Sequence, residues 1–244
     1  MRVVSFNIQA GINAGSAFDY VFRGHQHFVS TGAKTRTLKD IGAYLADFDL
    51  VCLQEVDFGG SRAGFRNQLD LIQDESGHGH RAELGTRKIG RISHHGNAIL
   101  SRHSIDDVTL ITLPGKIKGR GAIVARINAK KPLTVICLHL SLGEADQMAQ
   151  LTHIGRAVDL GGPVIICGDF NCARDSVPLR RFCKTFEFGI LGDRTRPTYP
   201  SWRPVRDFDH ILINWTPKKA GKLDTGPATM SDHLPVAYSG LQLP

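Results

Sequence analysis

Short hydrophobic runs recur along the chain, and most of them end at a polar residue. Runs of about four to eight residues that are rich in Val, Ile and Leu are typical of buried β-strands. We therefore predict strands over residues 3–8, 49–56, 96–101, 121–128, 133–141, 163–170, 208–214 and 234–239.

Three further segments carry apolar residues at the spacing of an amphipathic helix. They are residues 35–48, 67–76 and 144–160. Gly77 follows the second segment and a glycine pair at 161–162 follows the third, which favours a helix end at each place. Many strands with few helices between them indicate an α+β fold or a layered arrangement built on a β-sandwich.

The chain shows no break in composition and no low-complexity linker, so we expect residues 1–244 to form a single domain. Residues 9–34 and 189–207 lack a periodic pattern and are expected to be long loops. Long loops in a compact domain are commonly functional or disordered, and the aromatic content of these segments argues against disorder.

Charge bears on the class of partner. The net charge of +7 suits a polyanion such as nucleic acid, or an anionic membrane surface. The basic residues are spread along the whole chain, however, so an ordinary basic protein is an equal alternative.

Cysteine usage and hydropathy bear on location. The five cysteines include no Cys-x-x-Cys pair, which argues against a zinc ribbon or a redox motif. Cys52, Cys137 and Cys167 lie inside apolar runs, where a free thiol packs as a small hydrophobe. Neither a signal peptide nor an apolar stretch of about 18 residues is visible. We therefore expect a reduced, cytoplasmic protein with no transmembrane segment.

The candidate chemistry lies where the predicted strands meet loops. A single Asp at such a place is usually a turn residue or a helix cap, and a single His in an apolar strand is usually a core residue. Here six strand-end segments carry such residues together, which favours one shared site. The residues are Asn7, Glu55, His139, Asp169, Asn171, Asp209, Asp232 and His233.

Some of these residue types suit a hard metal ion. Glu55, Asp232 and the amide oxygen of Asn7 are oxygen ligands of the kind that Mg²⁺ or Mn²⁺ prefers. No group of His and Cys has the spacing of a zinc site.

The others suit the handling of water and phosphate. Asp169 and Asn171 are two positions apart, so on an extended segment both side chains would point to one face and could hold one attacking water. The rings of His139 and His233 could stabilise phosphate charge or transfer protons.

Seven motifs bring these residues together in one order: SFNIQ, LQEVD, GNAIL, LHLS, GDFN, FDHILI and SDHLPV. In this order they resemble the endonuclease/exonuclease/phosphatase superfamily, which includes deoxyribonuclease I, abasic-site endonucleases, neutral sphingomyelinases and inositol-polyphosphate 5-phosphatases. The resemblance spans residues 3–237. It implies a four-layered α/β/β/α sandwich of two packed, mainly antiparallel sheets flanked by helices, with the site at one edge.

The resemblance also implies roles for the residues that would hold metal and phosphate. Asn7, Glu55 and Asp232 would bind Mg²⁺ or Mn²⁺. Asn97, in GNAIL, would contact the phosphate, and His139 would stabilise it in the transition state.

The remaining matched residues would act on protons. Asp169 would activate the water as general base, and Asn171 would orient it. Asp209 would hydrogen-bond to His233, and His233 would bind the scissile phosphate or act as an acid.

Three more residues are candidates for substrate contacts. The stretch after LQEVD looks most like an unassigned bacterial branch of metal-dependent hydrolases in which an Arg follows this motif, and Arg62 occupies that place. Trp202 and Arg206 lie just before Asp209, where Arg could pair with a phosphate and Trp could stack on a base or cover a lipid head group. Packing is an equal alternative for these two.

Two other features favour plainer interpretations. Residues 113–122 place basic side chains among three glycines and could meet a phosphate backbone, but a solvated hairpin loop is favoured. Six histidines show no helical pairing and are expected mostly at the surface: His25, His27, His78, His80, His94 and His95.

The sequence thus predicts a metal-dependent hydrolase that cleaves a phosphate ester, with Asp169 as base. We expect a phosphodiester, in nucleic acid or a phospholipid head group, and a monomeric enzyme. A phosphomonoesterase of the same fold is one alternative. A binding module without catalysis is another, disfavoured because every expected catalytic residue is present.

Overall fold

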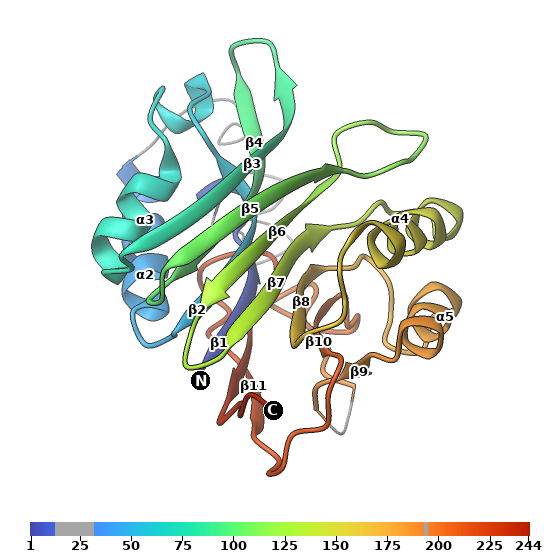
Figure 1. Cartoon of the computed structure of the whole chain (residues 1–244). Helices are drawn as coiled ribbons and strands as arrows, with labels where there is room; N and C mark the ends of the chain where they lie inside the picture. The colour runs from blue at the N-terminus through green and yellow to red at the C-terminus, as the bar shows by residue number, and fades with distance from the viewer. Residues whose placement is uncertain (13–31, 193–194) are drawn as a thin grey trace.

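The computed structural model describes residues 1–12, 32–192 and 195–244. Two six-stranded sheets pack face to face, and helices cover the outer face of each (Figure 1). Four of the five strand pairings in each sheet are antiparallel. The predicted α/β/β/α sandwich of two mainly antiparallel sheets is confirmed.

The first sheet is built from both ends of the chain. Its strand order is β11 (Lys222–Thr225), β12 (Val236–Ser239), β1 (Val3–Asn7), β2 (Leu50–Asp57), β4 (Ser93–Ser101) and β3 (His80–Ile89). The second sheet uses the middle of the chain, in the order β5 (Ile105–Thr112), β6 (Gly121–Asn128), β7 (Pro132–His139), β8 (Val164–Asp169), β10 (Asp209–Ile213) and β9 (Gly189–Ile190).

Each sheet has one parallel pair at its centre, β1 with β2 and β7 with β8. A parallel pair needs a crossover connection, and α2 (Gly32–Leu45) and α4 (Glu144–Ala157) lie in these two connections. The carboxyl ends of parallel strands lie at the same edge of a sheet. In each sheet, the carboxyl ends of the two parallel strands therefore lie next to each other, and these ends carry the polar residues that follow apolar runs.

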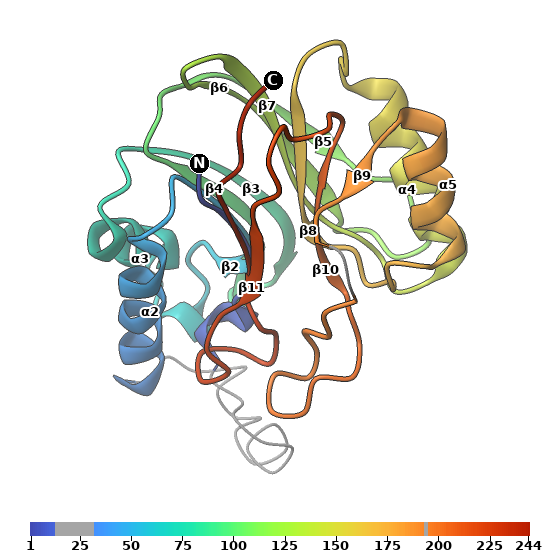
Figure 2. The same cartoon turned by 90° about the horizontal axis from the view of Figure 1, so that it is seen from below.

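Helices cover opposite sides of the sandwich (Figure 2). The α2 helix and α3 (Gln68–Ser76) lie against the first sheet, whereas α4 and α5 (Val177–Phe186) lie against the second. One apolar cluster fills the space between the sheets, and one lies beneath each helical layer. The residues between the sheets have almost no exposure, so the edge that carries the site is held on a rigid scaffold.

The structure has elements that the hydrophobic pattern did not predict. The strands β3 and β5 are edge strands of their sheets, and most of their residues are exposed, so their sequences lack a continuous apolar run. The α5 helix begins with Pro178 in its first turn, where a missing N–H costs nothing. The predicted helix 144–160 ends earlier, at Ala157, because Val158 is already extended.

The two predicted loops are only partly loops. Residues 9–34 begin with a 3-10 turn, Gln9–Gly11, and end in α2, while residues 13–31 lie outside the described part of the chain. Residues 189–207 contain β9 and an isolated bridge between Tyr199 and Arg206.

The cysteines in the apolar runs are buried, and so is one histidine that was expected at the surface. Cys52, Cys137 and Cys167 are free thiols buried in the core, as predicted. The surface location expected for His78 is wrong, because this residue is 3% exposed and its ring lies within hydrogen-bonding distance of Ser76 and the carbonyl of Phe48. His25 and His27 lie outside the described residues. Within the described ranges, no helix combines the length and apolar character of a membrane span.

Candidate active site

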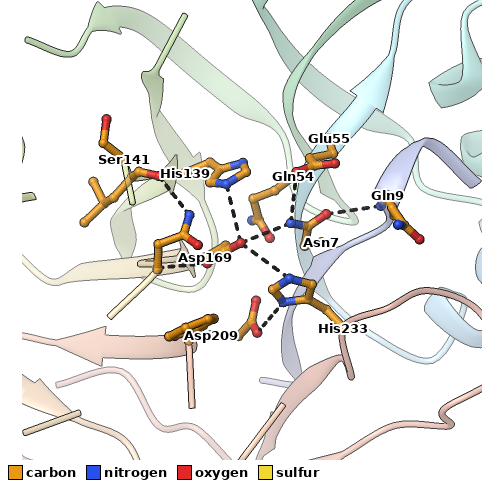
Figure 3. A network of polar contacts seen from close by, with 12 residues as sticks. Asn7, Gln9, Gln54, Glu55, His139, Ser141, Asp169, Asp209 and His233 are labelled. Carbon is orange, nitrogen blue, oxygen red and sulfur yellow. Dashed lines mark hydrogen bonds and ion pairs between the residues drawn. The ribbon is translucent and has the colours of Figure 1, made fainter. Parts of the chain in front are cut away.

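The polar residues that follow the strands of both sheets meet at one edge of the sandwich (Figure 3). Asn7 comes from β1, His139 from β7, Asp169 from β8 and Asp209 from β10. Strands β7 and β8 pair His139 directly with Asp169, and β8 and β10 pair Asp169 with Asp209. The pairing of β7, β8 and β10 therefore places these three residues of the predicted cluster side by side.

Asp169 lies at the centre of this cluster. Its Oδ2 accepts a hydrogen bond from Nδ2 of Asn7 at 3.1 Å and lies 3.4 Å from Nε2 of His139 and 3.8 Å from Nε2 of His233. The side chain is buried, with 1% exposure. Burial raises the pKa of Asp169 to about 7, against the opposing effects of the His233 charge and the hydrogen bonds from Asn7 and Asn171.

Asn171 is held differently from what an extended segment would predict. Its φ is 50°, in the left-handed region, so the two-residue alternation that we assumed after Asp169 does not hold at this position. Its backbone N–H instead donates to Oδ1 of Asp169 at 2.9 Å, and its side-chain Nδ2 donates to the carbonyl of Leu140 at 2.9 Å. The amide oxygen is the atom left to accept a hydrogen bond from water.

His233 is held by Asp209. The distance from Nδ1 of His233 to Oδ2 of Asp209 is 2.8 Å, and the hydroxyl of Thr198 donates to the same oxygen at 2.5 Å. The Tyr199 ring packs on the imidazole with 4.8 Å between centroids. Burial opposes protonation of His233, but the carboxylates of Asp209 and Asp169 outweigh it and raise its pKa to about 10. This imidazole is therefore a cation.

His139 behaves in the opposite way. Burial, together with the positive charges of Arg120 and His233, holds the pKa of His139 well below its usual value. Two histidines on either side of Asp169 thus carry different charges, since only His233 has a carboxylate on its far nitrogen.

Glu55 reaches the site through a break in its strand. The register between β2 and β4 shifts between Leu53 and Val56, and Glu55 has a φ of 59° inside this bulge. Positive φ is uncommon for a residue with a side chain and clusters at functional sites. The bulge leaves Gln54 fully buried and Glu55 half-buried at a cavity.

Asn7 joins Glu55 to Asp169. Its Nδ2 lies 3.5 Å from Oε1 of Glu55 as well as 3.1 Å from Asp169, and its Oδ1 accepts from the backbone N–H of Gln9 at 3.1 Å. The nitrogen rather than the oxygen faces the two carboxylates in this rotamer. Since an amide oxygen has two lone pairs, the Gln9 contact still leaves one for a ligand.

The last predicted metal ligand, Asp232, is also close to Glu55. Ser231 fixes this segment, because its hydroxyl donates to the Asn7 carbonyl at 2.7 Å and lies 3.3 Å from Oδ1 of Asp232. Burial raises the pKa of Asp232 to about 6, and the negative charge of Glu55 adds to this shift. A divalent cation would offset this accumulation of hard oxygen donors, so the residues fit the expected metal.

A second group must be weighed as a metal site. Asp169, Asp209 and His233 each offer a ligand atom within 4.8 Å of the other two, which makes them the one such His/Cys/Asp/Glu group among the described residues. However, these side chains already bond to one another and to a neighbour: Nδ1 of His233 contacts Oδ2 of Asp209 at 2.8 Å, and the same oxygen accepts from the Thr198 hydroxyl at 2.5 Å. The carboxylates of Glu55 and Asp232 are therefore the better candidates.

A cavity of about 500 Å³ opens beside the cluster, lined by Glu55, Asn97 and His139. Asn97 is buried, and its Nδ2 donates to the carbonyl of Gly121 at 2.9 Å, which ties β4 to β6. The basic loop between β5 and β6 is largely exposed, as expected for a solvated hairpin loop. The same loop forms one wall of the cavity. Four cations line the cavity: Arg87, Lys116, Lys118 and Arg120.

The predicted substrate residues lie further out. Nε of Arg62 contacts Oδ2 of Asp57. Nη2 of the same guanidinium lies 2.9 Å from Nδ1 of His95. Trp202 is half-buried, and Arg206 is exposed with its guanidinium 5.7 Å from the Phe208 ring centroid. Their contacts with substrate stay predictions.

Sequence reasoning missed several residues of this site. Thr198 and Tyr199 support Asp209 and His233 from a segment with no periodic pattern, and no local signal could have found them. His95 was expected at the surface but is half-buried and lines the cavity. The available signal was its position two residues before Asn97, because residues two apart on a strand point to the same face.

Comparison with known proteins identifies the class. The chain belongs to the Endonuclease/Exonuclease/phosphatase family, which it matches over residues 4–233. It is 31% identical over 183 residues to the uncharacterised protein YbhP of Escherichia coli K12, with 68% of this chain and 71% of YbhP covered. Membership of this family implies hydrolysis of phosphate esters.

Solved structures share the fold. The endonuclease/exonuclease/phosphatase from Beutenbergia cavernae matches with a TM-score of 0.75 at 20% identity, covering 98% of this chain and 70% of that one. The human Nocturnin catalytic domain with bound sulfate anion has a TM-score of 0.69 at 17% identity, covering 98% and 93%.

Proposed function

We propose that this chain is a divalent-metal-dependent phosphodiesterase whose residues 1–244 form one catalytic domain. The observation that carries the proposal is the environment of Asp169. A buried carboxylate with a pKa of about 7 lies between a neutral His139 and a cationic His233, at an edge lined by further oxygen ligands. A base of this pKa is matched to proton abstraction near neutral pH.

The roles follow from the contacts of each side chain. Asp169 accepts the proton of the attacking water, and the free amide oxygen of Asn171 orients that water. The cationic His233, held by Asp209, donates from Nε2 to the phosphate and gives its proton to the ester oxygen that leaves as its bond to phosphorus breaks. His139 and the buried amide of Asn97 donate to the other phosphate oxygens.

Glu55 and Asp232, with the second lone pair of the Asn7 oxygen, would hold Mg²⁺ or Mn²⁺. When bound, such an ion would polarise the phosphate and neutralise charge that develops on it. The pairing of Asn7 with both Glu55 and Asp169 would then keep the ligand and the base at a fixed separation.

The basic cavity supports an anionic substrate that extends beyond one phosphate. The side chains of Arg87, Lys116, Lys118 and Arg120 have no ion-pair partner in the part of the chain that the structure describes. We therefore favour a diester, in nucleic acid or in a phospholipid head group, over a monoester.

The experiment compares wild type with Asp169→Asn at saturating Mg²⁺ and in EDTA. The substrates are bis-p-nitrophenyl phosphate, p-nitrophenyl phosphate, plasmid DNA, an abasic oligonucleotide, RNA and short-chain phospholipids. Wild type should cleave a diester only with metal, and Asp169→Asn should lose activity by about 10³-fold or more. Asp175→Asn, an exposed carboxylate in the same segment, is the control and should be unaffected.

Three outcomes would contradict the proposal. Full activity in EDTA would exclude a requirement for metal, and preference for p-nitrophenyl phosphate would favour a monoesterase. Equal activity of wild type and Asp169→Asn would exclude Asp169 as the base.

A further inference from the structure

A histidine that the mechanism above does not use faces the same cavity. His95 lies on β4, two residues before Asn97, and it lines the cavity together with Glu55 and His139. The charged form of His95 lowers the pKa of His139, and the negative charge of Glu55 acts to raise the pKa of His95. One imidazole from each sheet therefore faces the space where the phosphate would bind.

A buried ion pair holds this ring from behind. Asp57 is the register partner of His95 across β2 and β4, and its side chain has no exposure. Oδ1 of Asp57 accepts from the backbone N–H groups of Gly59 at 3.1 Å and Gly60 at 3.0 Å, and Oδ2 pairs with Nε of Arg62. The guanidinium is thereby fixed in position beside the imidazole.

Arg62 itself cannot move far from this arrangement. It lies in a 3-10 turn, Ser61–Ala63, whose backbone is bonded to the β3–β4 connection: the N–H of Ser61 donates to Arg91 at 2.8 Å and that of Arg62 to Ile92 at 3.1 Å. Its side chain is 11% exposed.

The contact between Arg62 and His95 determines where the imidazole carries its proton. Nη2 of Arg62 lies 2.9 Å from Nδ1 of His95. A guanidinium only donates hydrogen bonds, so Nδ1 must be the acceptor and the proton of the neutral ring must be on Nε2. This Nε2–H has no hydrogen-bond partner among the residues the structure describes. Burial and the Arg62 charge both lower the pKa of His95, so they favour the neutral ring.

We propose that His95 is a further catalytic residue, which donates a hydrogen bond from Nε2–H to an oxygen of the substrate phosphate, and that Arg62 is a positioning residue that fixes this tautomer. The inference rests on the proposed function and deepens it. In this arrangement Arg62 acts on the substrate through His95, and the direct contact predicted from the sequence would require the guanidinium to leave both Asp57 and His95.

Two substitutions of His95 separate the two ring nitrogens. Gln can place its amide nitrogen near the position of Nε2, whereas Asn reaches only the position of Nδ1 and can still accept from Arg62. With bis-p-nitrophenyl phosphate and saturating Mg²⁺, His95→Asn should lose about 10²-fold in kcat/KM, the usual effect of removing one donor to a transition state. His95→Gln should stay within about tenfold of wild type.

His94→Gln is the matched control. This neighbouring ring packs against Phe58, 5.9 Å between centroids, and is not one of the residues that line the cavity. It should leave kcat and KM unchanged. Equal losses in His95→Gln and His95→Asn, or no loss in either, would overturn the proposal.

The tautomer can be measured without catalysis. In protein labelled with ¹⁵N-histidine, long-range ¹H–¹⁵N spectra should show His95 with its proton on Nε2, and Arg62→Gln should give a mixture of tautomers. Titration with inorganic phosphate in the presence of Mg²⁺ should shift the Nε2 signal. A proton on Nδ1, or no response to phosphate, would overturn the proposal. Because these readouts need no turnover, a wild type that cleaves no diester would count against the proposed function and not against His95.

Discussion

The two sheets have the same central arrangement but different chemistry at its end. In each, a parallel pair is joined by a crossover that contains a helix, and polar residues follow the paired strands. In the second sheet, His139 and Asp169 are direct register partners and both are buried. In the first, β2 is bulged, and Glu55 is half-buried at the cavity.

This difference in burial explains the different roles that we propose for Asp169 and Glu55. A carboxylate removed from water binds its proton more tightly, which suits Asp169 to act as a base near neutral pH. A carboxylate that keeps access to water can exchange that water for a metal ion, which suits Glu55 to be a ligand. Topology places both groups, and the local backbone decides which chemistry each supplies.

The largest effect that tests this division is expected for Glu55→Gln. Loss of the charge should weaken Mg²⁺ binding and lower kcat/KM at fixed Mg²⁺ by about 10²-fold or more, because the metal stabilises phosphate charge. Metal titrations of activity, with calorimetry of Mn²⁺ binding, measure this. Glu83→Gln, an exposed carboxylate of the same sheet, should behave as wild type. Unchanged metal affinity in Glu55→Gln would contradict the role of Glu55 as a metal ligand.

The second sheet is tested by Asp209→Asn. The carboxylates of Asp209 and Asp169 together raise the pKa of His233 to about 10, so loss of the Asp209 charge should lower that pKa and reduce kcat by about 10- to 100-fold. The alkaline limb of the pH–rate profile should move to lower pH by the same shift that NMR reports for the His233 ring. A profile that does not move, with the pKa lowered, would exclude His233 as the proton donor.

Stability against pH sharpens the contrast in burial. The pKa of Asp169 is about 7 in the folded protein against 3.8 for an ordinary Asp, so the unfolded chain loses its proton first. The contribution of Asp169 to the free energy of unfolding should therefore become unfavourable as pH rises between about pH 4 and 7, and this penalty should be complete above pH 7. In EDTA, Asp169→Asn should unfold at a higher temperature than wild type at pH 8, by several degrees. Coincident melting curves at pH 8 would contradict this expectation.

The smallest effects are expected outside both strand pairs. Trp202→Ala and Arg206→Ala change side chains near the surface of the segment before Asp209. Each should raise KM less than about tenfold on a large substrate and leave kcat unchanged, because rim contacts contribute little. A large loss of kcat would mean that this segment belongs to the catalytic centre.

The sequence predicted the fold best for strands that lie in the interior of a sheet. The strand predicted at 121–128 has those bounds, and the one at 163–170 differs by a residue at each end. The exposed edge strands β3 and β5 were missed, since a strand with solvent on one face and few neighbours needs no apolar run.

For the site, the sequence alone determined which residues occupy the strand ends, since a polar residue after an apolar run marks the end of a buried strand wherever the strand lies. Only the tertiary structure decided what those residues do. The bulge at Glu55, the contact of Asp209 with Thr198, and the pairing of Arg62 with His95 depend on atoms that the fold brings together. Charge, tautomer and proton affinity depend on burial and on partners distant in the chain, so no local pattern of residues can specify them.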